Sequence, residues 1–242
     1  MKTLSFPLLV IVLLFGACSK ENSTGKKPTL GGTYLLKSVT HNYGAGPMTD
    51  YFTYDDKNRI ASLHSSNSEE SYSYTYNAGN MLSVVSIYKS NVLEFVEKYT
   101  YTADVVSVQQ YAADGVTPYI QYSFKLSNNR VVEYKGEGAS NNIIDYTRDD
   151  KGNIVTVTGH SAGSPTIENI SYDTHPSPFA NIGITNLHVL FMLADSPYDN
   201  KNNVVQRTYM PGPYVYTYLE NGLPQSAVAP GGVSIQYDYD VK

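Results

Sequence analysis

The chain has 242 residues, 17 Lys and Arg against 22 Asp and Glu, a formal net charge of −5 and one cysteine. It has no cluster of basic residues, which argues against nucleic-acid binding, because that needs positive charge concentrated on one surface. One cysteine cannot form an internal disulfide. The 23 Tyr and 18 Gly, with abundant Val, Thr and Ser, favour strands and turns and predict a mainly β protein.

The first 17 residues have the features of a signal peptide. Lys2 supplies a positive start, and "LSFPLLVIVLLFGA" is an apolar run that ends in small residues before Cys18. The run is shorter than the about 20 residues that a membrane-spanning helix needs. The stretch resembles a bacterial lipobox, although Phe15 stands where Leu is usual. This resemblance implies cleavage before Cys18, acylation of that cysteine and anchoring to a membrane.

Residues 18–30 follow as a polar tether rich in Ser, Lys and Gly. With residues 1–17 removed, 16 Lys and Arg face 22 Asp and Glu, a balance of about −6. "CSKENS", with Glu21, resembles the segment after the lipidated cysteine in Bacteroidota lipoproteins. The resemblance implies an outer-membrane anchor with the domain at the cell surface, or else facing the periplasm.

Residues 31–242 are predicted to form a single β domain built from repeats. Each repeat has a strand that alternates Tyr with Ser or Thr, a turn of Asp, Asn, Lys and Gly, and a strand that alternates apolar with polar residues. The residues just before the turns align as Tyr54, Tyr76, Tyr101, Phe124, Arg148, Tyr172, Tyr218 and Tyr239. The steps between them are 22, 25, 23, 24, 24, 46 and 21 residues, so the long step equals about two repeats.

Strand alternation places Tyr72, Tyr74 and Tyr76 on one face and Ser71 and Ser73 on the other. We therefore expect a long antiparallel meander that forms a curved sheet or a partly open barrel. One face is rich in tyrosine and the other in hydroxyl groups.

The pattern Y-x-Y-[DN]-x-x-[GN]-x-[ILV] resembles the YD repeats of RHS proteins. Lipobox, tether and degenerate YD-like hairpins together resemble a Bacteroidota lipoprotein family of unknown function. RHS repeats build shells around a toxin, whereas this chain has few repeats and no toxin after them. The resemblance therefore implies an architecture rather than an activity.

Residues 173–203 interrupt the repeats. Within them, an apolar run places Leu187, Leu190, Phe191 and Ala194 at helical spacing. We expect a short helix over about 182–194 that packs on the concave face of the sheet and covers tyrosines. A membrane-dipping or ligand-gating element is the alternative.

Residues 159–163, "GHSAG", fit the G-x-S-x-G motif that presents a nucleophilic serine. The candidate triad is Ser161, Asp173 and either His175 or His188. In a hydrolase, the motif joins a strand to a helix, yet "SPTIENISY" predicts a second strand. A hairpin therefore explains the motif better than a nucleophile does.

Metal and cofactor sites have little support. The five histidines show no H-x-H or H-x-x-x-H spacing. "DDKN" at 55–58 and "DDKGN" at 149–153 lack the ligand pattern of a calcium loop, and turn chemistry explains both. We therefore expect neither a metal nor a cofactor.

Tyrosines are the remaining candidates for a ligand site. Their rings and the neighbouring hydroxyls suit a sugar or a peptide, and the candidates are Tyr51, Tyr72, Tyr99, Tyr214 and Tyr216. The alternative is that these rings form the core, and the lack of Trp weakens the glycan interpretation.

Three hypotheses follow. The first is an exported, lipid-anchored, non-enzymatic envelope protein that binds an extracellular glycan or protein. The second is a purely structural or scaffolding envelope lipoprotein, and the third is a serine hydrolase. The oligomeric state stays open.

Overall fold

The computed structural model describes residues 33–44, 46–136, 142–160, 164–180, 188 and 200–242. These residues form one antiparallel sheet of 16 strands, which confirms the mainly β class and the meander. The strands are β1 (Tyr34–Asn42), β2 (Pro47–Tyr54), β3 (Ile60–Ser65), β4 (Glu70–Tyr76), β5 (Leu82–Lys89), β6 (Val92–Tyr101), β7 (Val105–Ala112), β8 (Pro118–Ser127), β9 (Arg130–Gly136), β10 (Ile143–Arg148), β11 (Ile154–His160), β12 (Thr166–Pro176), β13 (Asn202–Arg207), β14 (Val215–Tyr218), β15 (Pro224–Val228) and β16 (Ser234–Val241). Cys18 and the tether lie outside the described residues.

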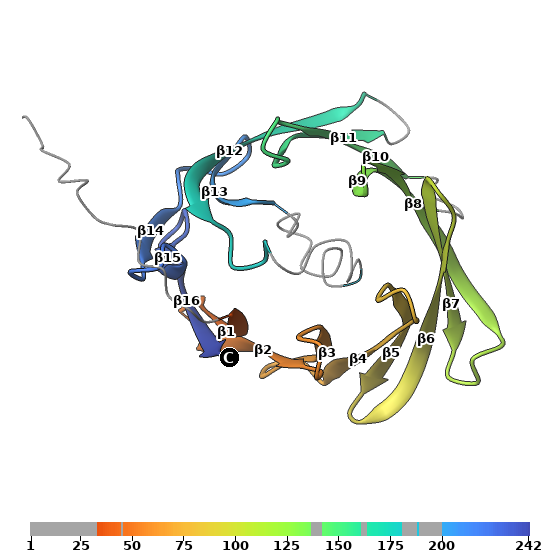
Figure 1. Cartoon of the computed structure of the whole chain (residues 1–242). Coiled ribbons are helices and arrows are strands. Elements are labelled where there is room, and N and C mark those ends of the chain that lie inside the picture. The colour runs from red at the N-terminus through yellow and green to blue at the C-terminus, as the bar shows by residue number, and fades with distance from the viewer. Residues whose placement is uncertain (1–32, 45, 137–141, 161–163, 181–187, 189–199) are drawn as a thin grey trace, which may run out of the picture.

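The sheet curls into a nearly closed barrel (Figure 1). Strand order follows the chain from β1 to β13, and β16, β15 and β14 continue it on the other side of β1. The two ends of the domain are joined, because Thr33 and Lys242 exchange two backbone hydrogen bonds of 3.0 Å. The free edges are β13 and β14, and the line where they face each other is called the seam below. The alternative of an open curved sheet is thus not what the structure shows.

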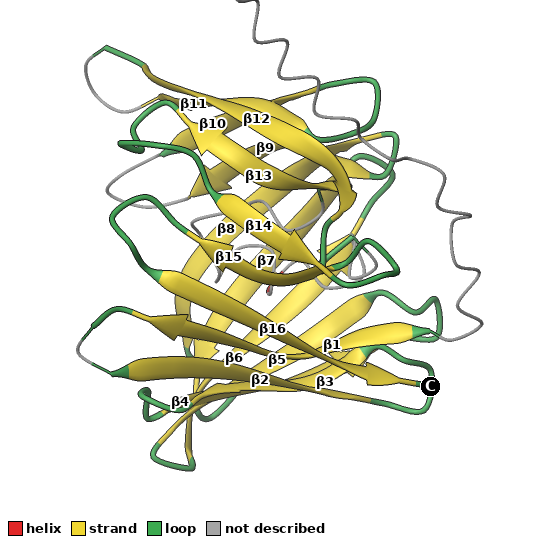
Figure 2. Ribbon diagram, turned by 90° about the vertical axis from the view of Figure 1, so that its left-hand side faces the viewer, coloured by secondary structure: helices red, strands yellow, loops and turns green. Residues whose placement is uncertain are grey.

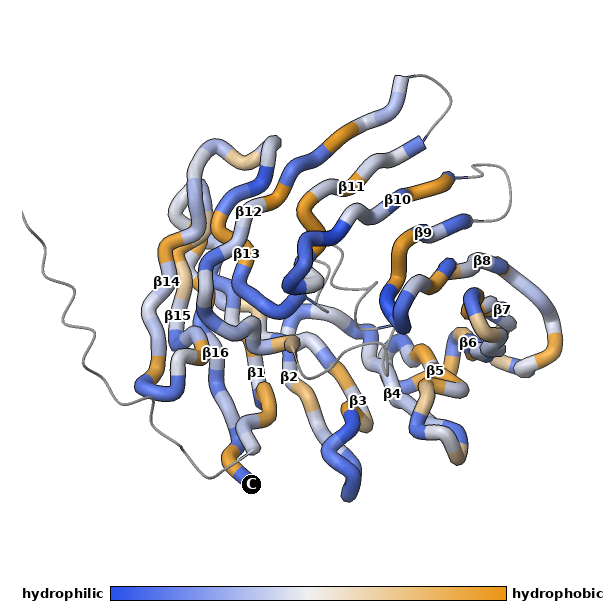
Figure 3. The backbone as a smooth tube through the Cα atoms, turned by 45° about the horizontal axis from the view of Figure 1, so that its top comes forward, coloured by the Kyte–Doolittle hydropathy of each residue, from blue (hydrophilic) through white to orange (hydrophobic). Residues whose placement is uncertain are grey.

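The strands are inclined to the barrel axis (Figure 2), as closure of a sheet requires. Apolar and polar residues alternate along most of them (Figure 3). The tyrosine-rich face, with Tyr72 and Tyr74 buried, points into the barrel and belongs to one hydrophobic core. The outer face carries hydroxyl, amide and charged side chains, and cross-strand pairs such as Thr53 with Ser62 hydrogen-bond there at 2.6 Å.

The turns have the chemistry that the sequence predicts. Asp55 Oδ1 accepts the backbone N–H groups of Lys57 and Arg59 at 2.9 Å, and Asn58 adopts a φ of 60°. Asp149 accepts the Asn153 N–H at 2.7 Å in the same way. Gly152 has a φ of 93°, and a Cβ there would lie 2.1 Å from the Arg130 guanidinium, so any other residue would be strained and would displace that side chain.

In most repeats, a tyrosine at or near the end of the second strand ties its hairpin to the preceding strand. Its hydroxyl donates a hydrogen bond of 2.6–2.9 Å to a backbone carbonyl near the start of that strand. The bonds run from Tyr54 to Leu36, Tyr76 to Ile60, Tyr101 to Leu82, Tyr172 to Ile154, Tyr216 to Val204 and Tyr239 to Pro224.

Three aligned positions differ from this rule. The Tyr218 hydroxyl donates to Asp173 Oδ2, and Tyr216, two residues earlier, makes the tie in its hairpin. The Arg148 guanidinium replaces the tyrosine and donates to the Val131 carbonyl. In β8, the register shift falls between Lys125 and Leu126, as it falls between Thr53 and Tyr54 in β2. Leu126, rather than Phe124, therefore takes the position before the turn, so the sequence alignment was wrong there. This step of the barrel lacks the hydroxyl tie, because leucine has no donor.

The interruption is shorter than predicted, since β12 extends to Pro176 and β13 begins at Asn202. The expected helix over about 182–194 lies outside the described residues except for His188, so it is not confirmed. Phe179 and His188 both lie against the concave face, with ring centroids 6.4 Å from Phe52 and 5.0 Å from Tyr72. No helix in the described residues is long and apolar enough to cross a membrane.

Candidate functional site

The seam has few backbone links. The Tyr214 N–H donates to the Val205 carbonyl at 2.7 Å, and further along the Tyr216 hydroxyl reaches the Val204 carbonyl at 2.9 Å. "PGP" at 211–213 precedes β14, and its two prolines have no N–H to donate. A side chain therefore replaces part of the backbone ladder at this place.

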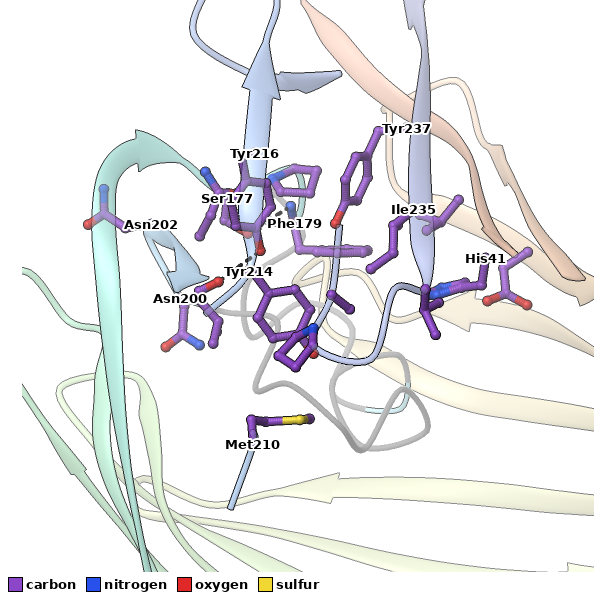
Figure 4. Close-up of a pocket in the computed structure, with 18 of the residues that line it drawn as sticks. His41, Ser177, Phe179, Asn200, Asn202, Met210, Tyr214, Tyr216, Ile235 and Tyr237 are labelled. Atoms are coloured by element: carbon purple, nitrogen blue, oxygen red, sulfur yellow. Dashed lines mark hydrogen bonds between the residues drawn. The ribbon is translucent and has the colours of Figure 1, made fainter. Parts of the chain in front are cut away.

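A cavity of about 240 Å³ lies inside the barrel beside the seam. Its walls come from β1, β2, β13, β14, β16 and the ends of the interruption, so strands from both ends of the domain and the seam meet around it (Figure 4). We call it the seam cavity. Tyr43, Met210 and Pro230 in its wall belong to connections that follow odd-numbered strands, which all end at one rim of the barrel.

Aromatic rings form much of the wall. Tyr214 and Tyr216 stack at 6.2 Å between centroids, and Phe52 meets Phe179 edge to face. Tyr237 enters from β16 (Figure 4). Such rings present flat apolar faces to an occupant.

The asparagines of the wall are already engaged. Asn200 Oδ1 accepts the Ile154 N–H at 2.8 Å, and the Asn203 amide donates to Asp173 Oδ2 at 3.1 Å. Asn202 donates to the His175 carbonyl at 3.1 Å. These side chains fix the ends of the interruption against β11 and β12, so they hold the wall in place.

Asp50 is the buried carboxylate of the seam cavity and is only 8% exposed. Antiparallel pairing sets it in one inward-facing row with Tyr237, Val39 and Ser65. Burial raises the pKa of the Asp50 carboxyl, and the Ser65 hydroxyl and the His41 and His64 imidazoles oppose that rise. Ser65 Oγ has no hydrogen-bond partner of regular geometry in the described part of the chain, although it faces the carboxylate.

Two further polar groups accompany Asp50. His41, on β1, lies opposite Ile235, and its ring stacks on Tyr43 at 5.7 Å. The Tyr237 hydroxyl has no hydrogen bond to any described residue. Burial raises the pKa of Tyr237, so the hydroxyl keeps its proton. The seam cavity thus combines aromatic faces, an acceptor and a hydroxyl that can donate.

Glu97, on β6, is the other buried inward-facing carboxylate, at 4% exposed. Tyr99 donates to its Oε2 at 2.8 Å and Gln110 to its Oε1 at 3.2 Å, and His188 Nε2 lies 3.8 Å from Oε2. Burial raises the pKa of Glu97, and burial lowers the pKa of His188 to about 3. The neutral imidazole also meets the Tyr74 hydroxyl at 3.2 Å. This saturated cluster, which we call the Glu97 network, joins the interruption to the wall.

The tyrosines proposed from the sequence separate into three places. Tyr214 and Tyr216 line the seam cavity. Tyr72 and Tyr99 are buried in the wall around the Glu97 network, so the core interpretation holds for them. Tyr51 points outward, where its ring stacks on His64 at 4.8 Å.

The described members of the predicted triad do not assemble. Asp173 accepts hydrogen bonds from Tyr218 and Asn203. The His175 ring stacks on Tyr218 at 3.8 Å, while His188 belongs to the Glu97 network. Ser161 lies outside the described residues. Gly159 pairs with Thr166, so the motif joins two antiparallel strands and lacks the helix of a nucleophile elbow.

No group of three or more His, Cys, Asp or Glu residues that could hold a metal ion occurs in the described ranges. In the two Asp-containing turns, the carboxylates of Asp55 and Asp149 accept hydrogen bonds from backbone N–H groups.

Sequence reasoning missed Asp50, His41 and Tyr237. Asp50 begins "DYFTY" and Tyr237 ends "IQY", and both stretches look like ordinary repeats. A signal did exist for Asp50, because it falls on the apolar phase of its strand, two residues before Phe52.

Comparisons with known proteins give little. No family model matches the chain, and no curated protein matches it. Among solved structures, a porin-like protein from Bacteroides vulgatus ATCC 8482 is similar over 86% of this chain and 99% of its own, with 11% identity and a TM-score of 0.41. A porin-like protein from Bacteroides uniformis ATCC 8492 is similar over 88% and 99%, with 11% identity and a TM-score of 0.39.

Proposed function

We propose that this is an exported, lipid-anchored, non-enzymatic envelope protein that binds an extracellular ligand, a glycan or a protein segment, inside its barrel. The observation that carries the proposal is the polarity of the barrel together with the seam cavity. The inner face holds most of the aromatic rings, whereas the outer face is mostly polar, with exposed exceptions such as Tyr51, Val215 and Val228. Binding by aromatic faces is therefore to be sought inside.

The same polarity supports a tethered protein. A barrel wall that faces lipid carries apolar side chains outward and polar ones inward. Here Ser71 and Ser73 point outward on β4, while Tyr72 and Tyr74 point inward. We infer that the barrel stands in water and that acyl chains on Cys18 hold it at the outer membrane, at the cell surface or facing the periplasm.

A thermal-shift screen of the mature chain carrying Cys18→Ser tests binding, with polysaccharides, oligosaccharides and peptides as probes. A ligand at 100 times its Kd adds about 2.7 kcal/mol. For a domain of this size, that raises Tm by roughly 5–10 °C. Scaffolding predicts no shift with any probe.

Two variants locate the ligand. Ala229 lines the seam cavity, whereas its neighbour Val228 is 47% exposed. We expect Ala229→Phe to abolish the shift and Val228→Phe to keep it. Binding that survives Ala229→Phe would place the ligand elsewhere and contradict this part of the proposal.

Anchoring is tested in the expressing cell. The full chain should be in the membrane fraction and should incorporate labelled palmitate. Cys18→Ser should release the protein and abolish labelling. Membrane retention of an unlabelled Cys18→Ser chain would refute the lipid anchor.

A further inference from the structure

We propose, building on the proposed function, that the seam cavity holds one sugar residue without negative charge, with its ring on the tyrosine wall and its hydroxyls donating to Asp50. Asp50 thereby becomes a ligand-binding residue.

Size restricts the occupant. Pockets for drug-sized molecules usually measure about 300–1,000 Å³, and the seam cavity measures about 240 Å³. It therefore suits one ring-sized unit rather than a folded partner or a long peptide. A chain of sugars would place one residue inside and leave the others at the rim.

The charge of the cavity wall further restricts which sugar can occupy the seam cavity. No Lys or Arg is among the residues of the described chain that line the cavity, and Asp50 is the only carboxylate there. An anionic sugar would place its carboxylate against Asp50, and among the described lining residues only the His41 imidazole could carry a positive charge to offset the repulsion. The cavity therefore selects against uronic acids and phosphorylated sugars.

Asp50 has unused acceptor capacity. A carboxylate offers about four lone-pair positions, and the Ser65 hydroxyl, which lies opposite on β3, makes no hydrogen bond of regular geometry to this one. Two neighbouring sugar hydroxyls supply two donors to a carboxylate in one plane. A buried acceptor without donors is costly, so a ligand that provides them is stabilised.

The row that contains Asp50 also supplies the second contact. Tyr237 lies two strands away, across β1, on the same inward-facing row. Two strand spacings are about 10 Å between backbones, and both side chains point into the barrel, one on either side of Val39. A single pyranose can contact the carboxylate at one end and the unpartnered Tyr237 hydroxyl at the other. Tyr214 and Tyr216, stacked at 6.2 Å, supply flat faces for the C–H groups of the ring.

The test is isothermal titration of the mature chain carrying Cys18→Ser with methyl glycosides and short oligosaccharides of common hexoses, their amino sugars and their uronic acids. We expect a neutral sugar to bind at least 10-fold more tightly than the uronic acid of the same configuration. Asp50→Asn should weaken the neutral sugar at least 10-fold and reduce that discrimination. Tyr237→Phe, a milder change that removes one hydroxyl, should weaken binding about 3-fold. Glu97→Gln, which alters the other buried carboxylate, should leave affinity unchanged.

Several results would overturn the inference, and they differ from failure of the proposed function. Equal or tighter binding of uronic acids, or neutral-sugar binding that Asp50→Asn leaves intact, refutes this inference alone. Binding of peptides or amines without sugars also refutes it, while the binding function stands. If no probe of any class binds the folded chain, both fall.

Discussion

The two buried carboxylates of the barrel lie in opposite circumstances. Glu97 receives hydrogen bonds from Tyr99 and Gln110 and faces His188, so its acceptors are occupied. Asp50 lies near the Ser65 hydroxyl and the His41 and His64 imidazoles, and it lines the seam cavity. Burial raises the pKa of both carboxyls. A buried acid whose partners are all intramolecular stabilises the fold, whereas one with spare acceptors beside a cavity is suited to a ligand.

The largest contrast should come from truncation. Glu97→Ala leaves the buried Tyr99 hydroxyl and the half-buried Gln110 amide without their acceptor, so we expect it to cost about 2–4 kcal/mol and to lower Tm by roughly 5–15 °C. Asp50→Ala removes a buried carboxyl group to which Ser65 Oγ makes no hydrogen bond of regular geometry, so its effect should stay within about 1 kcal/mol of zero. Calorimetry of both variants measures the difference. Equal losses would remove the distinction between the two acids.

A second contrast concerns the tyrosine hydroxyls. Tyr76→Phe and Tyr216→Phe each lose one hydrogen bond to a backbone carbonyl, worth about 1 kcal/mol. β4 keeps its backbone pairing with β3 and β5, but β14 has little backbone pairing with β13. We therefore expect Tyr216→Phe to speed amide exchange in β13 and β14, and Tyr76→Phe to leave local exchange nearly unchanged. Uniform exchange in both variants would show that the seam is no weaker than the wall.

These ties also show how far the sequence could go. The tyrosine before the turn, the Asp or Asn at its start and the Gly or Asn at positive φ predict hairpins, a tyrosine face and a hydroxyl face, and all of these appear. The repeat period of the sequence cannot by itself predict whether the sheet closes into a barrel, because an open meander and a barrel have the same local pattern. Closure depends on two contacts between strands far apart or unpaired in the repeat pattern: β1 pairs with β16, and β13 meets β14 at the seam.

The site was less predictable for the same reason. Asp50 and Tyr237 are 187 residues apart in the sequence, and only closure sets them in one row. Tyr214 and Tyr216 were found because aromatic residues two apart on a strand share a face whatever the topology. The G-x-S-x-G motif misleads when separated from its context, since Gly159 and Thr166 are a strand pair.

The pH dependence of stability should separate the acids again. A carboxyl whose folded pKa is raised stabilises the fold when protonated, fully so below its unfolded pKa of about 4. This contribution is lost as the pH rises through the folded pKa. Asp50→Asn should therefore be no more stable than the parent at pH 3.5 and more stable at pH 7, by up to about 1 kcal/mol. Urea titration at both pH values checks the sign.

Glu97→Gln should behave differently in the same experiment. Loss of the charge again flattens the pH dependence. The glutamine amide, however, cannot accept from both Tyr99 and Gln110, so we expect a penalty of about 1 kcal/mol at either pH. A gain at pH 7 equal to that of Asp50→Asn would contradict a saturated Glu97 network.

The smallest effect should come from the outer face. Thr53 and Ser62 exchange a hydroxyl hydrogen bond across β2 and β3, and Thr217 and Ser226 do so across β14 and β15 beside the seam. Both pairs are solvent-exposed, so water replaces the lost partner, and Thr53→Val or Thr217→Val should cost at most about 0.5 kcal/mol. Ligand affinity should be unchanged in both variants. Because Thr217 is next to Tyr216 and points the other way, an affinity loss in Thr217→Val alone would mean that the outer wall at the seam takes part in binding, which the polarity of the barrel argues against.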